Sequence, residues 1–140
     1  MTAKSSGTHR EHGVPANLRY SKNHEWVRVE EDVATVGITD HAQQALGDIT
    51  YVELPPLDKR VKQSEELAAV ESAKAASDIY APVSGVVAEV NAVLEDTPEK
   101  VNVDPYGEGW ICKLGTIDAS ELDNLLTARQ YRELLAREEK

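Results

Sequence analysis

One lysine in the middle of the chain has a setting suited to covalent modification. Lys74 lies between Ala73 and Ala75, and β-like runs lead into and out of this position. Two such runs that meet predict a hairpin, so we expect Lys74 at or near its tip. Lysine offers a primary amine on a flexible stem, and acylation converts that amine into a neutral amide. The small neighbours would let a modifying enzyme reach the amine and would leave a tethered group room to move.

Other residues that could do chemistry lack supporting partners. His24-Glu25 and Asp40-His41 are adjacent pairs, but neighbours along a strand point to opposite faces, and no nucleophile motif accompanies them. The four histidines have no paired spacing, so we expect no metal site. The single cysteine, Cys112, excludes an intramolecular disulfide and is typical of a small core thiol. Independent catalysis is therefore not expected.

The elements that must position Lys74 are predominantly strands. Alternating and β-rich runs predict strands at 25–30, 33–38, 49–54, 66–72, 77–80, 86–90 and 110–114. In the last of these, Trp110, Cys112 and Leu114 should share one face. Capping patterns predict helices that begin at Asp40 with Gln43, at Thr97-Pro98, at Asp118 with Glu121, and at Thr127 with Gln130. Short strands with small helices and no βαβ alternation favour a compact β-barrel or sandwich.

Length and composition limit the class of protein. The 140 residues predict a disordered polar tail at 1–15 and one domain at 16–140. The net charge of −10 argues against nucleic-acid binding, because phosphate neutralisation needs a basic surface. No run resembles a transmembrane span or a secretory signal, so a soluble, cytoplasmic protein without membrane contact is expected. Between residues 65 and 108 stand ten acidic residues and two lysines, which predicts salt-sensitive docking to basic partner surfaces or else a merely solvating surface.

Longer segments carry a resemblance to a known family. The segment ESAKAASDIYAPVSGVVAEVN closely resembles the lipoyl-attachment segment of glycine cleavage H proteins, and in-register similarity covers about residues 18 to 135. The further similar segments are 23–27, 36–43, 46–49, 51–55 and 101–110. Asp58 and Ser64 depart from this pattern, because they stand where the family's turns favour glycine.

The resemblance implies a fold, a cofactor and its site. The fold would be mainly β, a lipoyl-domain-like barrel-sandwich hybrid (a flattened β-barrel) with short helices and a C-terminal helical segment. The protein would be a non-catalytic carrier with lipoic acid attached covalently to Lys74. The attachment segment around that lysine would comprise Glu71, Ser72, Ala73, Ala75 and Asp78, of which Glu71 and Asp78 would help the attaching enzyme recognise the lysine.

The resemblance also implies a role in glycine degradation. The arm would receive the aminomethyl group of glycine from a pyridoxal-phosphate-dependent decarboxylase (P protein) and pass it to a tetrahydrofolate-dependent aminomethyltransferase (T protein). Dihydrolipoyl dehydrogenase (L protein) would reoxidise the arm, and a lipoate-attaching enzyme would install it. We expect a monomer. Glu25, Asp78 and Asn23 match family positions near the loaded arm, where carboxylates would suit a cationic amine; otherwise Glu25 caps a strand end and Asp78 is a solvated turn residue.

Two alternative functions of a modified lysine stay open at this stage. Biotin is disfavoured, because biotinylated lysines typically sit between methionines and the only methionine is Met1. A relay protein that hands lipoyl groups to other enzymes would carry the same segment as a glycine cleavage carrier. The sequence does not separate these two lipoyl-dependent roles.

Overall fold

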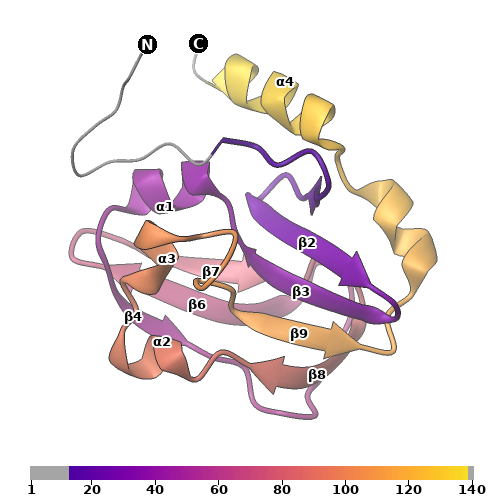
Figure 1. The fold of residues 1–140 in the computed structure, drawn as a ribbon, viewed down its shortest axis with the longest axis horizontal. Coiled ribbons are helices and arrows are strands. Elements are labelled where there is room, and N and C mark those ends of the chain that lie inside the picture. The colour runs from indigo at the N-terminus through magenta and orange to yellow at the C-terminus, as the bar shows by residue number, and fades with distance from the viewer. Residues whose placement is uncertain (1–12, 139–140) are drawn as a thin grey trace.

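The computed structural model describes residues 13–138, which form two antiparallel sheets with helices around them (Figure 1). The six-stranded sheet has the order β1-β2-β3-β9-β8-β5, and the three-stranded sheet has the order β4-β6-β7. The strands are β1 Arg19–Tyr20, β2 Glu25–Glu30, β3 Val33–Ile38, β4 Ile49–Glu53, β5 Arg60–Val61, β6 Glu66–Ser72, β7 Ala76–Tyr80, β8 Gly85–Val90 and β9 Cys112–Gly115. Among the described residues no strand pairing joins the two sheets. The expected mainly β fold is confirmed, with two open sheets in place of a closed barrel.

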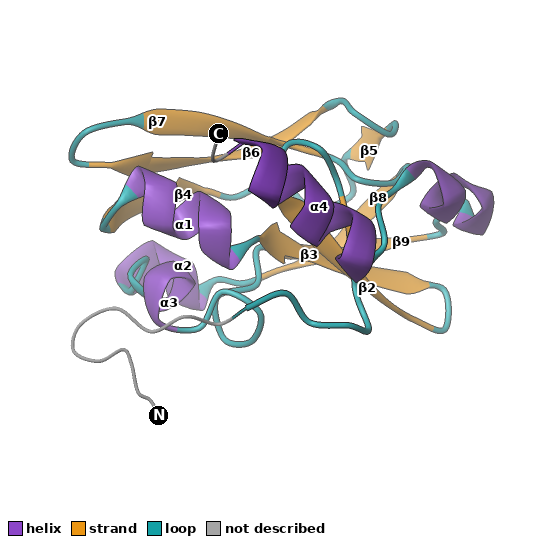
Figure 2. Cartoon of the chain, turned by 90° about the horizontal axis from the view of Figure 1, so that it is seen from above, coloured by secondary structure: helices purple, strands orange, loops and turns teal. Residues whose placement is uncertain are grey.

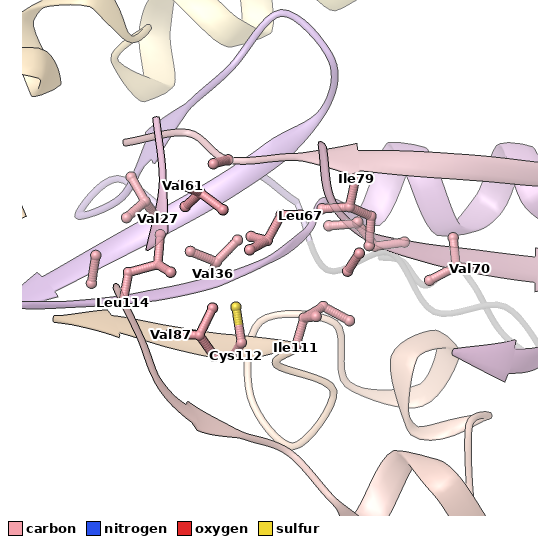
Figure 3. Packing of buried hydrophobic residues seen from close by; sticks show 14 of the residues in the cluster. Val27, Val36, Val61, Leu67, Val70, Ile79, Val87, Ile111, Cys112 and Leu114 are labelled. Atoms are coloured by element: carbon pink, nitrogen blue, oxygen red, sulfur yellow. The ribbon is translucent and has the colours of Figure 1, made fainter. Parts of the chain in front are cut away.

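The main hydrophobic core lies between the sheets. Figure 3 shows Val36, Val87 and Cys112 of the larger sheet pointing toward the same interior as Leu67 and Ile79 of the smaller one. These side chains are almost fully buried, and each such burial contributes about 1.5–3 kcal/mol. Because successive residues of a strand alternate between faces, this core fixes which side chains of β6 and β7 point outward.

A second hydrophobic cluster attaches the C-terminal helix to the outer face of the larger sheet. Trp26 on β2 and Tyr20 on β1 pack with Tyr131 of α4, which spans Ala128–Glu138. The rings of Tyr20 and Tyr131 are stacked with their centroids 4.6 Å apart. Figure 2 shows α4 lying across the strands on this side. The adjacent residues Trp26 and Val27 thus serve different clusters, which explains why β2 is buried on both faces at this point.

The helices begin close to where the capping patterns place them. Thr127 and Gln130 form the expected reciprocal capping box before α4, with N–O distances of 3.0 and 3.2 Å. Helix α1, Asp40–Leu46, is capped by Thr39 and not by Asp40, because the Thr39 hydroxyl accepts from the Ala42 amide. Asp118 caps the 3-10 helix η1, Ala119–Asn124, by accepting from the Ser120 amide.

Three expectations about local structure were wrong in detail. The short helix expected from Thr97-Pro98 begins later, at Lys100 (α3, Lys100–Val103), and Thr97 instead caps the end of α2, Val93–Asp96. Glu121 does not complete a capping box, because its carboxylate accepts from the amide and hydroxyl of Ser84. Trp110 precedes β9 and does not share the core face of Cys112, since it packs with the second cluster.

The two residues that depart from the family pattern at turns, Asp58 and Ser64, have a left-handed backbone conformation. Their φ values are 68° and 77°, in the left-handed region that favours glycine.

Of the predicted tail at 1–15, residues 1–12 lie outside the described residues. The Gly13 and Pro15 carbonyls accept hydrogen bonds from the hydroxyls of Tyr106 and Tyr20, so residues 13 and 15 of the predicted tail contact the domain. In the described part of the chain, no helix combines the length and apolar character needed to span a membrane.

Candidate functional site

The turn that carries Lys74 is held by the side chain of Ser72. The Ser72 amide donates to the Ala75 carbonyl at 2.7 Å and closes the turn between β6 and β7. The Ser72 hydroxyl oxygen accepts from the amides of Lys74 and Ala75 at 3.4 and 3.1 Å. A serine that satisfies turn amides in this way restrains the backbone of a loop. Lys74 therefore projects from an ordered turn, as the hairpin pattern predicted.

The lysine side chain passes beside the end of helix α1. Gly47 caps α1 with φ 84°, and a Cβ added there would lie 3.4 Å from Lys74 Cε and 3.9 Å from its Nζ. Both views show the β6–β7 turn projecting at one end of the molecule, with α1 nearby (Figures 1 and 2). Because Gly47 has no side chain, the aliphatic part of the Lys74 side chain can lie close to the end of α1. Nothing in the sequence pattern pointed to this contact, because the two residues are brought together only by tertiary structure.

The other residues of the predicted attachment segment are open to solvent. Glu71, Ala73, Ala75 and Asp78 are all exposed, and Ser72 is partly buried. Asp78 pairs with Ala69 in the β6–β7 register. The strand alternation puts it on the face opposite Ile79, whose side chain is in the core. A modifying enzyme would meet this whole segment on the surface.

Glu25 is a buried carboxyl group near the other end of β7. Its side chain is only 2% exposed. One carboxylate oxygen accepts from the Ser21 hydroxyl at 2.5 Å, and the other accepts from the Tyr80 amide at 2.9 Å. Burial raises the pKa of Glu25, and the hydrogen bonds from Ser21 and Tyr80 lower it in part. The Glu25 side chain thus connects β2 to β7. This contact goes beyond the alternative expectation that Glu25 only caps the end of a strand.

A pocket of about 310 Å³ opens beside Glu25. Asn23 and Glu25 line it together, so two of the three predicted arm-binding residues share one cavity. Its apolar wall includes Ala81, Pro82, Leu125 and Leu126, and the side of the pocket formed by residues 124–126 was not associated with the site from the sequence. Asp78 does not line this pocket; it lies two residues before Tyr80, which does. At about 3.4 Å per residue, the four steps of β7 from Ala76 to Tyr80 span about 14 Å.

Comparisons with known proteins show the family to which this chain belongs. The family model described as Glycine cleavage H-protein matches residues 18–138. The glycine cleavage system H protein of Halorhodospira halophila is 56% identical over 126 residues, covering 89% of this chain and 97% of that protein. That of Thermus thermophilus is 55% identical over 125 residues, covering 89% and 98%. The crystal structure of the H protein from Mycobacterium marinum has a TM-score of 0.80 at 35% identity, covering 88% of this chain and 99% of that one. The chain therefore belongs to the glycine cleavage H-protein family.

Proposed function

We propose that Lys74 is the attachment site of a covalent lipoyl group. The observation that carries this assignment is that Lys74 is exposed on a turn ordered by Ser72. Its neighbours in the chain are alanines, and Gly47 lies next to its side chain. When attached, a lipoyl group supplies a disulfide that accepts electrons and a one-carbon unit. As a member of its family, the chain is a non-catalytic carrier of the glycine cleavage system. Its own residues therefore present, orient and shelter the arm.

The pocket beside Glu25 is the resting place that we assign to the loaded arm. Its carboxylate and the amide of Asn23 offer polar partners for a cationic amine, while Ala81, Pro82 and Leu126 offer apolar walls. The Glu25 carboxylate is already held by two hydrogen bonds, so it needs little reorganisation to face a cation. Asp78 lies on the route along β7 from the turn to the pocket, exposed and able to contact the arm in passing.

The partners follow from the same proposal. The chain would visit the glycine decarboxylase, the aminomethyltransferase and dihydrolipoyl dehydrogenase in turn, after a lipoate-attaching enzyme has modified Lys74. The exposed attachment segment, with Glu71 and Asp78 on either side of the lysine, supports recognition by several enzymes. A monomeric state and a cytoplasmic location stay predictions.

A conservative exchange of Lys74 tests the assignment. We expect Lys74→Arg to keep the fold and the charge but to lose lipoylation completely, because a guanidinium does not form the amide. The measurement is intact mass with peptide mapping after expression with lipoate and an attaching enzyme. Lys59→Arg is the matched control, since Lys59 is also an exposed lysine at a turn, and it should be modified like the wild type. Full lipoylation of the arginine variant would disprove the proposal.

The role of the pocket has a separate test. In lipoylated protein we expect Glu25→Gln to shorten the lifetime of the aminomethyl cargo by several-fold, because the variant removes a negative charge from the pocket while keeping its shape. Hydrolytic loss of the cargo, followed by mass, gives that lifetime. Glu133→Gln, an exposed carboxylate on α4, is the control and should change nothing. An unchanged lifetime in the Glu25 variant would contradict the pocket assignment and leave the attachment at Lys74 intact.

A further inference from the structure

Two histidines and a glutamate from distant parts of the chain converge outside the site described above. His24 precedes β2, His41 lies in the first turn of α1, and Glu138 ends α4. One donor atom from each lies within 4.8 Å of the other two. The Nε2 atoms of His24 and His41 are 3.3 and 3.9 Å from the Glu138 Oε1 atom. No sequence pattern indicated this group, because its members come together only when α4 packs on the rest of the domain.

The second ring nitrogen of His24 is already engaged. His24 Nδ1 is 2.7 Å from the Tyr131 hydroxyl, which is in turn 2.7 Å from the Thr39 hydroxyl. Nδ1–H can donate a hydrogen bond to the Tyr131 hydroxyl, which then donates to the Thr39 hydroxyl. In that arrangement His24 Nε2 carries a lone pair that faces Glu138 and is available as a ligand. Metal-binding histidines commonly have such a partner on the other nitrogen, because it fixes the tautomer and the ring orientation.

The C-terminal end of α4 favours a positive charge close to the two histidines. His24 has a φ of 72°, which is uncommon for a residue other than glycine. Its side chain contacts Tyr131 and Glu138 of α4. Glu138 is the last residue of α4, where the helix dipole is negative and disfavours an unpaired carboxylate. The rings of His24 and His41 lie 4.6 Å apart. A cation held between the three side chains would complement both the carboxylate and the helix end.

We propose that His24, His41 and Glu138 bind a divalent transition-metal cation of the zinc type, which fastens α4 to the sheet. Two imidazoles and one carboxylate suit Zn²⁺ and exclude a dedicated Mg²⁺ or Ca²⁺ site, since those cations take oxygen ligands. At Zn–ligand distances of about 2.0–2.2 Å, tetrahedral ligands lie about 3.3–3.6 Å apart, and the 3.3 Å between His24 and Glu138 is at the lower end of this range. His41 moves inward by a side-chain adjustment, and water takes the fourth position.

Zinc titration of the full, lipoylated chain tests this site. After treatment with a chelator, we expect calorimetry to show one Zn²⁺ bound per chain and the thermal midpoint to rise with zinc concentration. His41→Asn and Glu138→Gln should each weaken zinc binding by at least about tenfold, because each removes a direct ligand. Glu133→Gln is the matched control on the same helix and should bind zinc like the wild type. His9→Ala with His12→Ala removes the other two histidines of the sequence and should also leave binding unchanged.

The outcomes separate a built site from adventitious binding. Zinc binding that survives Glu138→Gln and His41→Asn, or that disappears with His9 and His12, would overturn the proposal. Absence of a zinc-dependent shift in the wild-type thermal midpoint would do so too. Because Glu138 is 41% exposed and His41 is 33% exposed at their side chains, both variants should fold, and their unchanged thermal midpoint without zinc verifies this. The lipoylation assay on the same samples shows that any loss at this site is independent of Lys74.

Discussion

Opposing effects act on the carboxyl group of Glu25. Burial disfavours its charged form and raises its pKa, whereas the hydrogen bonds from Ser21 and Tyr80 favour the charged form. The raised pKa means that burial outweighs the hydrogen bonds. In the unfolded chain the same group has its ordinary pKa of 4.5. The folded protein therefore binds a proton at Glu25 over a pH range in which the unfolded chain has released it.

This difference between the folded and unfolded pKa of Glu25 predicts that the free energy of unfolding depends on pH. As the pH rises above 4.5, folding must keep an increasingly ionised Glu25 buried, so its contribution to the free energy of unfolding falls until the folded pKa is passed. Glu25→Gln lacks this titration and keeps an acceptor for the Tyr80 amide. Urea unfolding of both proteins between pH 4.5 and 8 should show the variant gaining stability relative to the wild type as pH increases. A constant difference, or one of opposite slope, would be evidence against a raised pKa.

The surroundings of Lys74 were predictable only in part. The pattern of two β-like runs meeting at Lys74 is local, and the structure confirms the hairpin turn there. The resemblance to the family also predicted Glu25 and Asn23 as residues near the arm, and these two residues line one pocket. It did not give Gly47 beside the lysine or Leu126 in the pocket wall, because those contacts depend on how α1 and the C-terminal segment pack. Resemblance transfers a position, whereas the geometry around it has to come from the fold.

Among the secondary-structure elements, those with a strong local signal were placed correctly. Strand β6 has the predicted bounds, and the Thr127–Gln130 capping box forms because both partners are within one helical turn. The two-residue strands β1 and β5 went unrecognised, since two residues carry no periodicity. Asp40 was mistaken for a cap because Thr39, an equally good capping residue, stands directly before it. Its carboxylate instead accepts from the side-chain amides of Gln43 and Gln44.

The pairing of β2 with β3 depends on a close approach at Gly37. Gly37 is paired with Trp26, and a Cβ added at Gly37 would lie 2.6 Å from the indole ring. The ring has no room to retreat, because it is fully buried and its Nε1 donates to the Pro105 carbonyl at 3.0 Å. We expect Gly37→Ala to reduce the free energy of unfolding by about 1–3 kcal/mol through overpacking. Chemical denaturation measures the change.

Gly115 supplies the control for that strand glycine. It lies on β9 of the same sheet, and a Cβ there would have its nearest neighbour at 3.7 Å, an ordinary van der Waals contact. Gly115→Ala should therefore be tolerated, with a change well below that of Gly37→Ala. Equal effects of the two substitutions would show that strand glycines matter here for backbone reasons and that the contact with Trp26 does not decide the outcome.

At the scale of the whole molecule, charge is distributed unevenly along the chain. The net charge is −10, and residues 65–108 hold ten acidic residues against Lys74 and Lys100. Lys100 is paired with Glu108 at 2.9 Å, and the proposed acylation of Lys74 would remove the other positive charge of this stretch. The stretch contains the attachment turn and continues through α2 and α3, where Glu95 and Glu99 are exposed. If Lys74 is lipoylated as proposed, the loaded carrier would present a strongly acidic stretch of chain to its partner enzymes.

This charge predicts salt-sensitive association of the lipoylated carrier with the glycine decarboxylase. Long-range attraction to a basic docking surface raises the association rate, and it weakens as the Debye length falls from about 10 Å at 0.1 M salt to about 3 Å at 1 M. Glu95→Gln with Glu99→Gln should slow association several-fold at low salt and have little effect at high salt, as stopped-flow mixing would measure. Asp123→Asn with Glu133→Gln removes the same amount of charge outside the stretch and should slow association less. If both pairs slow association equally, the net charge of the molecule controls the encounter, and the acidic stretch has no special part in it.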